Sequence, residues 1–513
     1  GKMIVASTQG ILVADVSRAG ATQIDEKGVA SITGFSAAHG LEQKGVMLLS
    51  DSSSPAALTS AFVARGAVKS FAARTTFTEA FRNMELTSFP TIDVSNGVDC
   101  SYAWDGYRGT SFPALNFASA TNLSNAWLTS YSLTSVPAIQ APVCVDFTSA
   151  WQGNTALATI DPNANFGESA SSVNFTDAFR TSGLTALPTN LDMSQGSSFY
   201  ATFFGCSSFA TIGTGVLLGT ASNNVNFGYA FYASGLTALP AGLDLSQGSD
   251  FNNAFNGCGS LATIGTGVLL GTASSSVDFT NAFRSTALTA LPAGLDMSQG
   301  DTFASGFRDC SSLATIGTGV LLGTANATAT VDFTSAFRTS GLTALPAGLD
   351  MSQGNTFREA FRDCSSLATI GTGVLLGTAN ATVTVDFTLA FYNCTNLVTL
   401  PANLNLSKGD DFYAAFYNCS SLVTFPAGAF DTMGTPLDFC FLSAWLGTNA
   451  LSGASVDAIL DSIDTSGQSA PTIVTNEADI TIDYDTGTTA PAYTTLASLK
   501  GKGWVIIVNG TTL

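Results

Sequence analysis

Histidine and basic residues are scarce in this chain, and each scarcity excludes a class of function. The single histidine, His39, lies outside the repeats that fill most of the chain, so no Ser-His-Asp or Cys-His catalytic arrangement can form within them. Only 18 lysines and arginines accompany 37 acidic residues, for a net charge of −19, whereas nucleic acid requires clustered basic side chains. No stretch reaches the roughly 18 consecutive apolar residues of a membrane-spanning helix. We therefore expect no nucleic-acid partner and no direct membrane span.

Charged residues of both signs are also few, yet the chain has the means to build a core. Charged residues make up 11% of the sequence and apolar residues 45%, with 36 phenylalanines and 50 glycines. This many large apolar side chains distinguishes the chain from disordered sequences, which have few of them.

A glycine-rich string, IGTGVLLGTA, first occurs at residues 212–221. Glycine-rich turns can bind phosphate when they lead into a helix. The string recurs unchanged at residues 264–273, 316–325 and 370–379, and no copy is followed by the Lys-Ser or Lys-Thr of a phosphate-binding loop. A string that returns at a period of 52 to 54 residues indicates a repeat architecture.

The repeat is defined by a large apolar residue followed four positions later by Phe or Trp, here called the first and second anchors. The first anchors occur fifteen times, at Phe77, Cys100, Leu123, Phe147, Phe175, Phe199, Phe227, Phe251, Phe279, Phe303, Phe333, Phe357, Phe387, Phe412 and Phe441. The anchor segment predicts one or two helical turns, and the Leu-Thr-Ala-Leu run closed by Pro predicts a short strand. Single repeats of this size cannot bury their apolar faces, so stacked repeats must share a core. We expect an N-terminal attachment domain over 1–55, a solenoid over 56–447 and a C-terminal cap over 448–513.

The motif FREAFRDCSSLATI, residues 357–370, resembles the core of BspA-type leucine-rich repeats, and LDMSQGNTF before it resembles related repeats of bacterial surface proteins. The resemblance covers roughly 77–445, and the segment 455–504 resembles the C-terminal end of such proteins, including phage-encoded ones. It implies a leucine-rich-repeat solenoid of about 15 units, with a parallel sheet and short helices or turns. It also implies a role in adhesion or host recognition without catalysis.

Cysteine and aspartate recur at fixed positions in the repeat. Cys206, Cys258 and Cys310 lie in alternate repeats, about 10 Å apart by strand spacing, which exceeds the reach of a disulfide. For the cysteines of successive repeats, which include Cys394 and Cys419, a disulfide remains an alternative. The recurrent aspartates predict caps that bind backbone N–H groups; they are Asp192, Asp244, Asp296, Asp350, Asp278, Asp332 and Asp386. We expect no metal and no cofactor.

Two surfaces are candidate binding sites. The residue after the second anchor is repeatedly Arg or Tyr, which anchor interfaces and suit sugars and carboxylates; the candidates are Arg180, Tyr232, Arg284, Arg308, Arg338, Arg362, Tyr392 and Tyr417. The alternative is that these arginines only neutralise the aspartate six residues earlier, as Asp278 would for Arg284 and Asp332 for Arg338. The second candidate is a polar ridge of inserted loops that includes Asn326 and Asn380.

These features predict a non-enzymatic extracellular recognition protein, either an adhesin of a bacterial cell surface or a receptor-binding fibre or appendage of a phage virion. The expected partners are a host-cell surface glycan or protein, and an attachment partner on the virion or cell envelope bound through the N-terminal domain. Two alternatives remain: a structural or decoration protein, and a polysaccharide-degrading enzyme that uses a carboxylate pair.

Overall fold

The computed structural model describes residues 75–83, 86–89, 91, 93–325, 330–379, 384–471 and 480–513, and describes the backbone alone at 2–7, 10–15, 21–24 and 30–32. The chain forms two compact units, Gly1–Leu236 (unit 1) and Thr237–Leu513 (unit 2). The boundaries that we expect at 55 and 447 stay a prediction.

Unit 1 begins with two antiparallel hairpins, β1 (Lys2–Ser7) with β2 (Gly10–Asp15) and β3 (Ala21–Ile24) with β4 (Ala30–Ile32). The strands of its repeats are short and pair in parallel between neighbouring repeats. They are β5 (Ser135–Val136), β6 (Gln140–Ala141), β7 (Thr159–Ile160), β8 (Asn165–Phe166), β9 (Val173–Asn174), β10 (Ala186–Leu187), β11 (Asp192–Met193), β12 (Gly196–Ser198), β13 (Thr211–Ile212), β14 (Leu217–Leu218) and β15 (Val225–Asn226).

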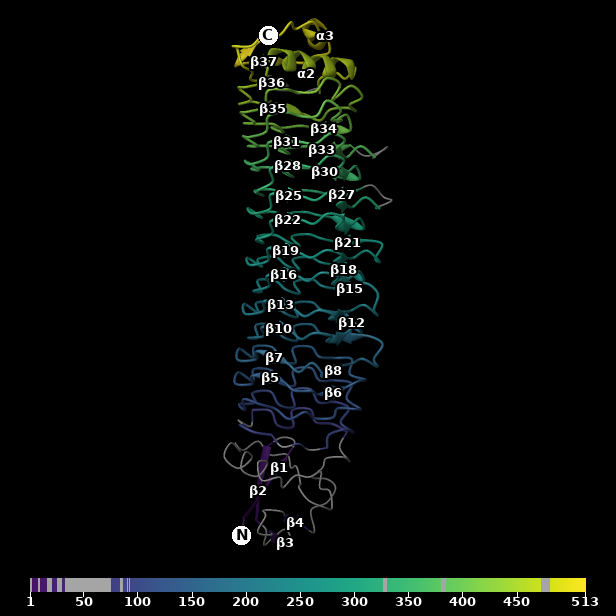
Figure 1. Ribbon diagram of the computed structural model, residues 1–513, viewed down its shortest axis with the longest axis vertical. Helices are drawn as coiled ribbons and strands as arrows, with labels where there is room; N and C mark the ends of the chain where they lie inside the picture. Colours follow the sequence, from purple (N-terminus) through teal and green to yellow (C-terminus); the bar gives the residue numbers. More distant parts are fainter. Residues whose placement is uncertain are drawn as a thin grey trace. The chain divides into compact units, whose positions relative to one another are not determined.

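Unit 2 continues the same pattern of parallel ladders (Figure 1). One ladder precedes the anchors: β18 (Gly248–Asp250), β21 (Val277–Asp278), β24 (Gly300–Thr302), β27 (Val331–Asp332), β30 (Gly354–Thr356), β33 (Val385–Asp386) and β34 (Gly409–Asp411). A second comprises β17 (Asp244–Leu245), β20 (Leu269–Leu270), β23 (Asp296–Met297), β26 (Leu321–Leu322), β29 (Asp350–Met351) and β32 (Leu375–Leu376). Pairs form between β16 (Ala238–Leu239) and β19 (Thr263–Ile264), β22 (Ala290–Leu291) and β25 (Thr315–Ile316), and β28 (Ala344–Leu345) and β31 (Thr369–Ile370).

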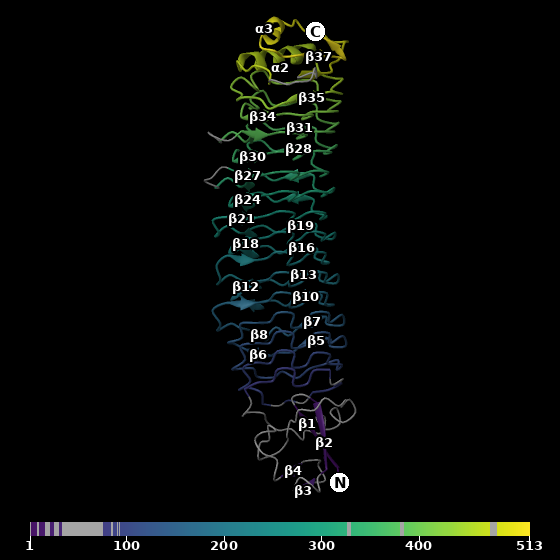
Figure 2. The same ribbon diagram turned by 180° about the vertical axis from the view of Figure 1, so that it is seen from behind.

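The predicted parallel-sheet solenoid and its short Leu-Thr-Ala-Leu strands are therefore confirmed, and within each unit successive repeats lie one upon another (Figure 2). Stacked phenylalanine rings form the core. First-anchor rings such as those of Phe303 and Phe333 have centroids 5.3 Å apart and lie within 7° of parallel. Leu345, Leu367 and Ile370 are buried, as predicted.

Turns replace the short helices that we expect at the anchors. The second and the sixth residue after every first anchor have positive φ, for example 56° at Ser335, and an α-helix cannot contain such residues. Backbone hydrogen bonds alternate accordingly. The Ala336 N–H donates to the Phe333 carbonyl of its own repeat at 3.0 Å, whereas the Ser335 N–H donates to the Arg358 carbonyl of the next repeat at 2.8 Å. Each anchor segment thus joins two repeats while it turns.

The cysteine position forms a polar ladder inside the apolar core. Six of the nine cysteines hold this position, seven residues after a first anchor, and all nine are buried as thiols. The Cys364 thiol donates to the carbonyl of Phe337 at 3.1 Å and lies 3.3 Å from the Ser340 hydroxyl, which holds the same position one repeat earlier. Ser or Thr can therefore alternate with Cys at this position, because the hydroxyl of one repeat contacts the thiol of the next.

The C-terminal part of unit 2 has two helices, α2 (Gly453–Thr465) and α3 (Leu496–Gly501), and a four-stranded sheet. The sheet comprises β35 (Phe441–Trp445), β36 (Ile480–Ile482), β37 (Ile506–Val508) and β38 (Thr511–Thr512). The Ser455 and Ser462 hydroxyls of α2 accept the backbone N–H groups of Phe425 and Phe430, at 3.0 and 2.8 Å. These N–H groups belong to the repeat that begins at Phe412, and the two serine hydroxyls of α2 satisfy them.

Candidate functional site

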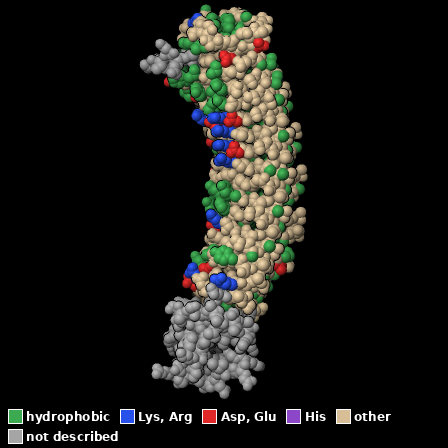
Figure 3. Space-filling view, turned by 90° about the vertical axis from the view of Figure 1, so that its left-hand side faces the viewer, with side chains coloured by type: hydrophobic (Ala, Val, Ile, Leu, Met, Phe, Trp, Pro, Cys, Tyr) green, Lys and Arg blue, Asp and Glu red, His purple; other side chains and the backbone are tan. Residues whose placement is uncertain are grey.

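The fifth residue after each first anchor lies at the edge of the solenoid because it directly follows the inward-pointing second anchor. In unit 2, six consecutive repeats place Arg or Tyr there. We call this set the guanidinium–aromatic stripe; it consists of Arg284, Arg308, Arg338, Arg362, Tyr392 and Tyr417. Figure 3 shows basic and acidic side chains together on one face, with hydrophobic side chains beside them. Unlike the anchors, these residues are partly exposed.

Ion pairs hold the arginines of the stripe, but their partners differ from those that we expect. Arg284 lies 3.3 Å from Asp309 of the next repeat, and Arg308 lies 3.4 Å from the same carboxylate. Arg338 and Arg362 both pair with Glu359, at 2.5 and 3.1 Å. The four arginine side chains are 24–36% exposed, so each pair contributes little stability and chiefly orients a guanidinium.

The aspartate six residues before the arginine does not form this pair. The Asp278 and Asp332 carboxylates accept the backbone N–H groups of Thr280 and Thr334, both at 2.7 Å. The predicted capping role of the recurrent aspartates is therefore confirmed here, and it directs the carboxylates to the turn. The proposed pairs Asp278–Arg284 and Asp332–Arg338 are wrong.

At one end of the stripe, a guanidinium and two aromatic rings stack in three consecutive repeats. The Arg362 guanidinium lies over the Tyr392 ring, 4.9 Å from its centroid. Tyr392 and Tyr417 stack with centroids 4.7 Å apart and planes within 6°. A cation above an aromatic face is attracted by the ring's electron density, so the stack is a stabilised arrangement.

Unit 1 contains the same stack. The Arg180 guanidinium lies 4.4 Å from the centroid of Phe204, which stacks on Tyr232 at 4.8 Å. Arg180 is also paired with Asp177 at 3.0 Å. Arg180 and Tyr232 are predicted site residues, whereas Phe204 does not fit the Arg-or-Tyr pattern. Its position, five residues after the first anchor Phe199, is the signal in the sequence that identifies it.

This arrangement determines which chemistry the stacks can perform. Stacked neighbours cover the faces of the inner rings. The polar groups that the stacks can offer a ligand are therefore phenol hydroxyls and guanidinium N–H groups other than the buried Nε–H of Arg362. These groups form hydrogen bonds with hydroxyl and carboxylate oxygens, and guanidinium groups bind carboxylates in a fork geometry. The stacks therefore suit oxygen-rich ligands better than apolar ones.

The remaining predicted residues, Asn326 and Asn380, lie outside the described residues. Among the residues described, no group of three or more His, Cys, Asp or Glu side chains is placed to hold a metal ion. No helix in the described ranges is long and apolar enough to cross a membrane.

Comparisons with known proteins give structural neighbours only. No family model and no curated protein matches the chain. A leucine-rich repeat protein from Bacteroides ovatus matches with 15% identity and a TM-score of 0.42, over 72% of this chain and 81% of the other. A leucine rich cell surface protein from Faecalibacterium prausnitzii matches with 14% identity and a TM-score of 0.23, over 67% and 74%.

Proposed function

We propose that this protein is a non-enzymatic recognition protein of an outer surface, either a bacterial adhesin or a phage receptor-binding fibre, and that its stacks bind a host-cell surface glycan. The observation that carries the proposal is the recurrence of one stack, Arg over aromatic over Tyr, in both units. A second surface partner, on the virion or cell envelope, would be bound through the N-terminal domain.

The stack is better explained by binding than by stability. Its members lie outside the core. Within the core, the anchor phenylalanines already join the repeats through buried ring contacts. The guanidinium and the phenols add hydrogen-bonding groups at the edge of the solenoid, and Arg and Tyr are the side chains that most often carry interface energy. Glycans present rows of hydroxyl groups that match such a surface.

The test is binding to a glycan array, followed by affinity measurement on the best ligand with a Tyr392→Phe, Tyr417→Phe double variant. The substitution removes two hydroxyls and preserves the stacked rings, as Phe204 does at the same position in unit 1. The loss of two hydrogen bonds should weaken binding by about tenfold.

One control variant and one further test variant complete this experiment. Tyr493→Phe, which removes a phenol hydroxyl far from the stripe in sequence, should bind as the unmodified chain does. Arg362→Lys retains the charge but loses the planar group over Tyr392, and it should also weaken binding. Unchanged affinity in the double variant would refute the stripe as the binding surface.

A further inference from the structure

Two exposed tyrosines hold a repeat position that the stacks do not use. The residue directly after the first anchor is Ser or Thr in eight of the fifteen repeats and Tyr in two, at Tyr200 in unit 1 and Tyr413 in unit 2. The two side chains are 40% and 41% exposed, whereas the anchors beside them are buried. Packing of the core therefore does not account for these rings.

The two tyrosines share a local sequence pattern. Each is followed by a buried alanine, Ala201 or Ala414, and three residues later by a stack residue, Phe204 or Tyr417. The other thirteen repeats carry larger side chains at the alanine position. The residue that follows each tyrosine is thus too small to cover its ring.

In unit 1, Tyr200 extends the stack into a continuous aromatic patch with Phe204, Tyr229 and Tyr232. Tyr200 contacts Tyr229 of the next repeat, with ring centroids 5.7 Å apart and planes at 60°. Tyr229 in turn has its centroid 5.6 Å from that of Tyr232 and 6.5 Å from that of Phe204. Because the planes of Tyr200 and Tyr229 are steeply inclined, Tyr229 does not cover Tyr200 by stacking. A contiguous exposed patch of this kind is typical of a binding surface.

The guanidinium groups of the stacks carry no unbalanced charge. Arg180, which lies over Phe204, pairs with Asp177 at 3.0 Å. Arg362, which lies over Tyr392, pairs with Glu359 at 3.1 Å. The stacks therefore offer hydrogen-bonding groups without an excess of positive charge, which favours a neutral ligand over an anionic one.

We propose that Tyr200 and Tyr413 each pack on the apolar face of a neutral hexopyranose residue. A pyranose ring has C–H bonds on its face and hydroxyl groups around its rim, so its face suits an aromatic ring while its rim suits phenols and guanidinium N–H groups. The stacks supply the polar groups, and the exposed tyrosines supply the open ring surface that stacked rings lack. This inference rests on the proposed function, glycan binding by the stacks, and adds the class of sugar.

The test is saturation-transfer NMR and titration with methyl β-D-galactopyranoside and methyl β-D-glucopyranoside, with D-glucuronate as the acidic counterpart. Saturation should be strongest at the ring C–H protons of one sugar face. A Tyr200→Thr, Tyr413→Thr double variant, which introduces a residue common at this position, should bind the neutral sugars at least about tenfold more weakly. Tyr200→Phe, Tyr413→Phe retains the rings and should bind as the unmodified chain does.

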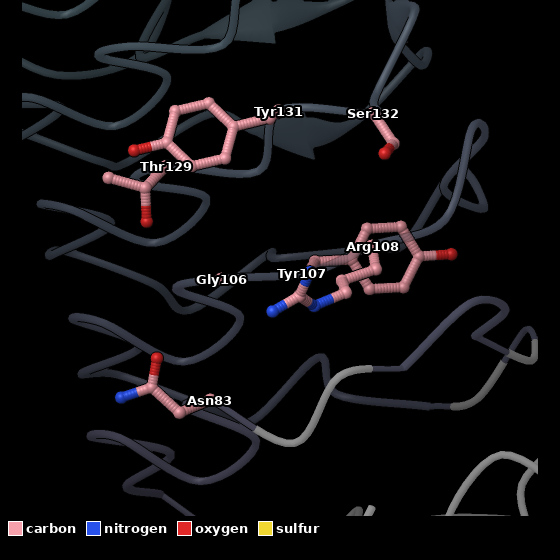
Figure 4. A pocket seen from close by; sticks show the side chains of 7 residues that line it. All are labelled: Asn83, Gly106, Tyr107, Arg108, Thr129, Tyr131 and Ser132. Atoms are coloured by element: carbon pink, nitrogen blue, oxygen red, sulfur yellow. The ribbon is translucent and has the colours of Figure 1, made fainter.

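Tyr131 provides the matched control. It is 60% exposed and lines a hollow of about 290 Å³ in unit 1, together with residues that include Thr129 and Ser132 (Figure 4). Its repeat carries Ser124 and Leu128 at the two positions where the repeat of Tyr200 carries Tyr and Phe. Tyr131→Ser therefore removes an exposed tyrosine outside the pattern, and it should leave binding of the neutral sugars unchanged.

The outcomes separate this inference from the proposed function. A glycan-array signal that the Tyr200→Thr, Tyr413→Thr variant retains in full would overturn the inference alone. Loss of binding in that variant, with unchanged affinity in Tyr392→Phe, Tyr417→Phe, would support the inference and count against the stripe. Tighter binding of D-glucuronate than of both neutral sugars, or an equal loss in Tyr131→Ser, would also overturn the inference. Absence of any array signal would overturn both.

Discussion

At the residue scale, the stability of each repeat depends on rings that contact two neighbours at once. Phe361 is fully buried and stacks on Phe337 and Phe391, with centroid distances of 5.6 and 5.2 Å. Removing such a ring eliminates contacts with both adjacent repeats and leaves a cavity that rigid ladders fill poorly.

We expect Phe361→Ala to lower the free energy of unfolding by about 3–5 kcal/mol, as other buried Phe to Ala changes do. Arg358→Ala, at a side chain that is 51% exposed, should change it by less than about 0.5 kcal/mol. Urea unfolding followed by circular dichroism measures both variants. A loss under about 1 kcal/mol for Phe361→Ala would mean that the anchor register is wrong.

Residue spacing predicts side-chain positions well but backbone conformation poorly. The periodic anchors placed the phenylalanines inward, the aspartates at turns and the arginines at the edge, because one register governs every repeat. The prediction of short helices is wrong because residues such as Leu389 and Tyr229 have positive φ, which their residue type does not indicate. The acidic partners of the arginines were missed for a related reason, since Asp309 and Glu359 reach them only through the turn geometry.

At the element scale, the recurrent glycine string forms a strand that lies between two glycines with positive φ, and the second of these is closely packed. In the third copy, β26 lies between Gly319 and Gly323, which have φ of 72° and 66°. A Cβ on Gly323 would lie 2.7 Å from the Val331 side chain and 2.9 Å from the Gly300 carbonyl. The glycines thus allow close approach between repeats, and this explains why the string recurs without a phosphate site.

Gly323→Ala should therefore lower the free energy of unfolding by at least about 2 kcal/mol, through both backbone strain and overlap. Gly242→Ala is the matched control, because its φ is 71° but no atom lies within 4 Å of the added Cβ. It should cost only the strain of positive φ, about 1 kcal/mol. Equal losses in the two variants would show that the close approach at Gly323 does not matter.

At the scale of the whole molecule, buried thiols occur throughout the repeats of both units and link stability to pH. Burial raises the pKa of Cys206 and of Cys364 to about 11, and the pKa of Cys144 to about 12. Burial likewise raises the pKa of Cys100, Cys310, Cys394 and Cys419. In the unfolded chain these thiols ionise near their ordinary pKa of about 8.5.

The folded state therefore holds thiol protons more tightly than the unfolded state, so the stabilising effect is complete below about pH 8.5 and is lost as the pH rises toward 11. We expect the free energy of unfolding, measured in urea with a reductant present, to fall across this range. A Cys206→Ser, Cys364→Ser variant should show a smaller fall, because Ser182 and Ser340 already occupy this position in neighbouring repeats and serine does not ionise there. Tyrosine and lysine titrate alike in both proteins, so parallel curves for the two would contradict the assignment of the pH dependence to these thiols.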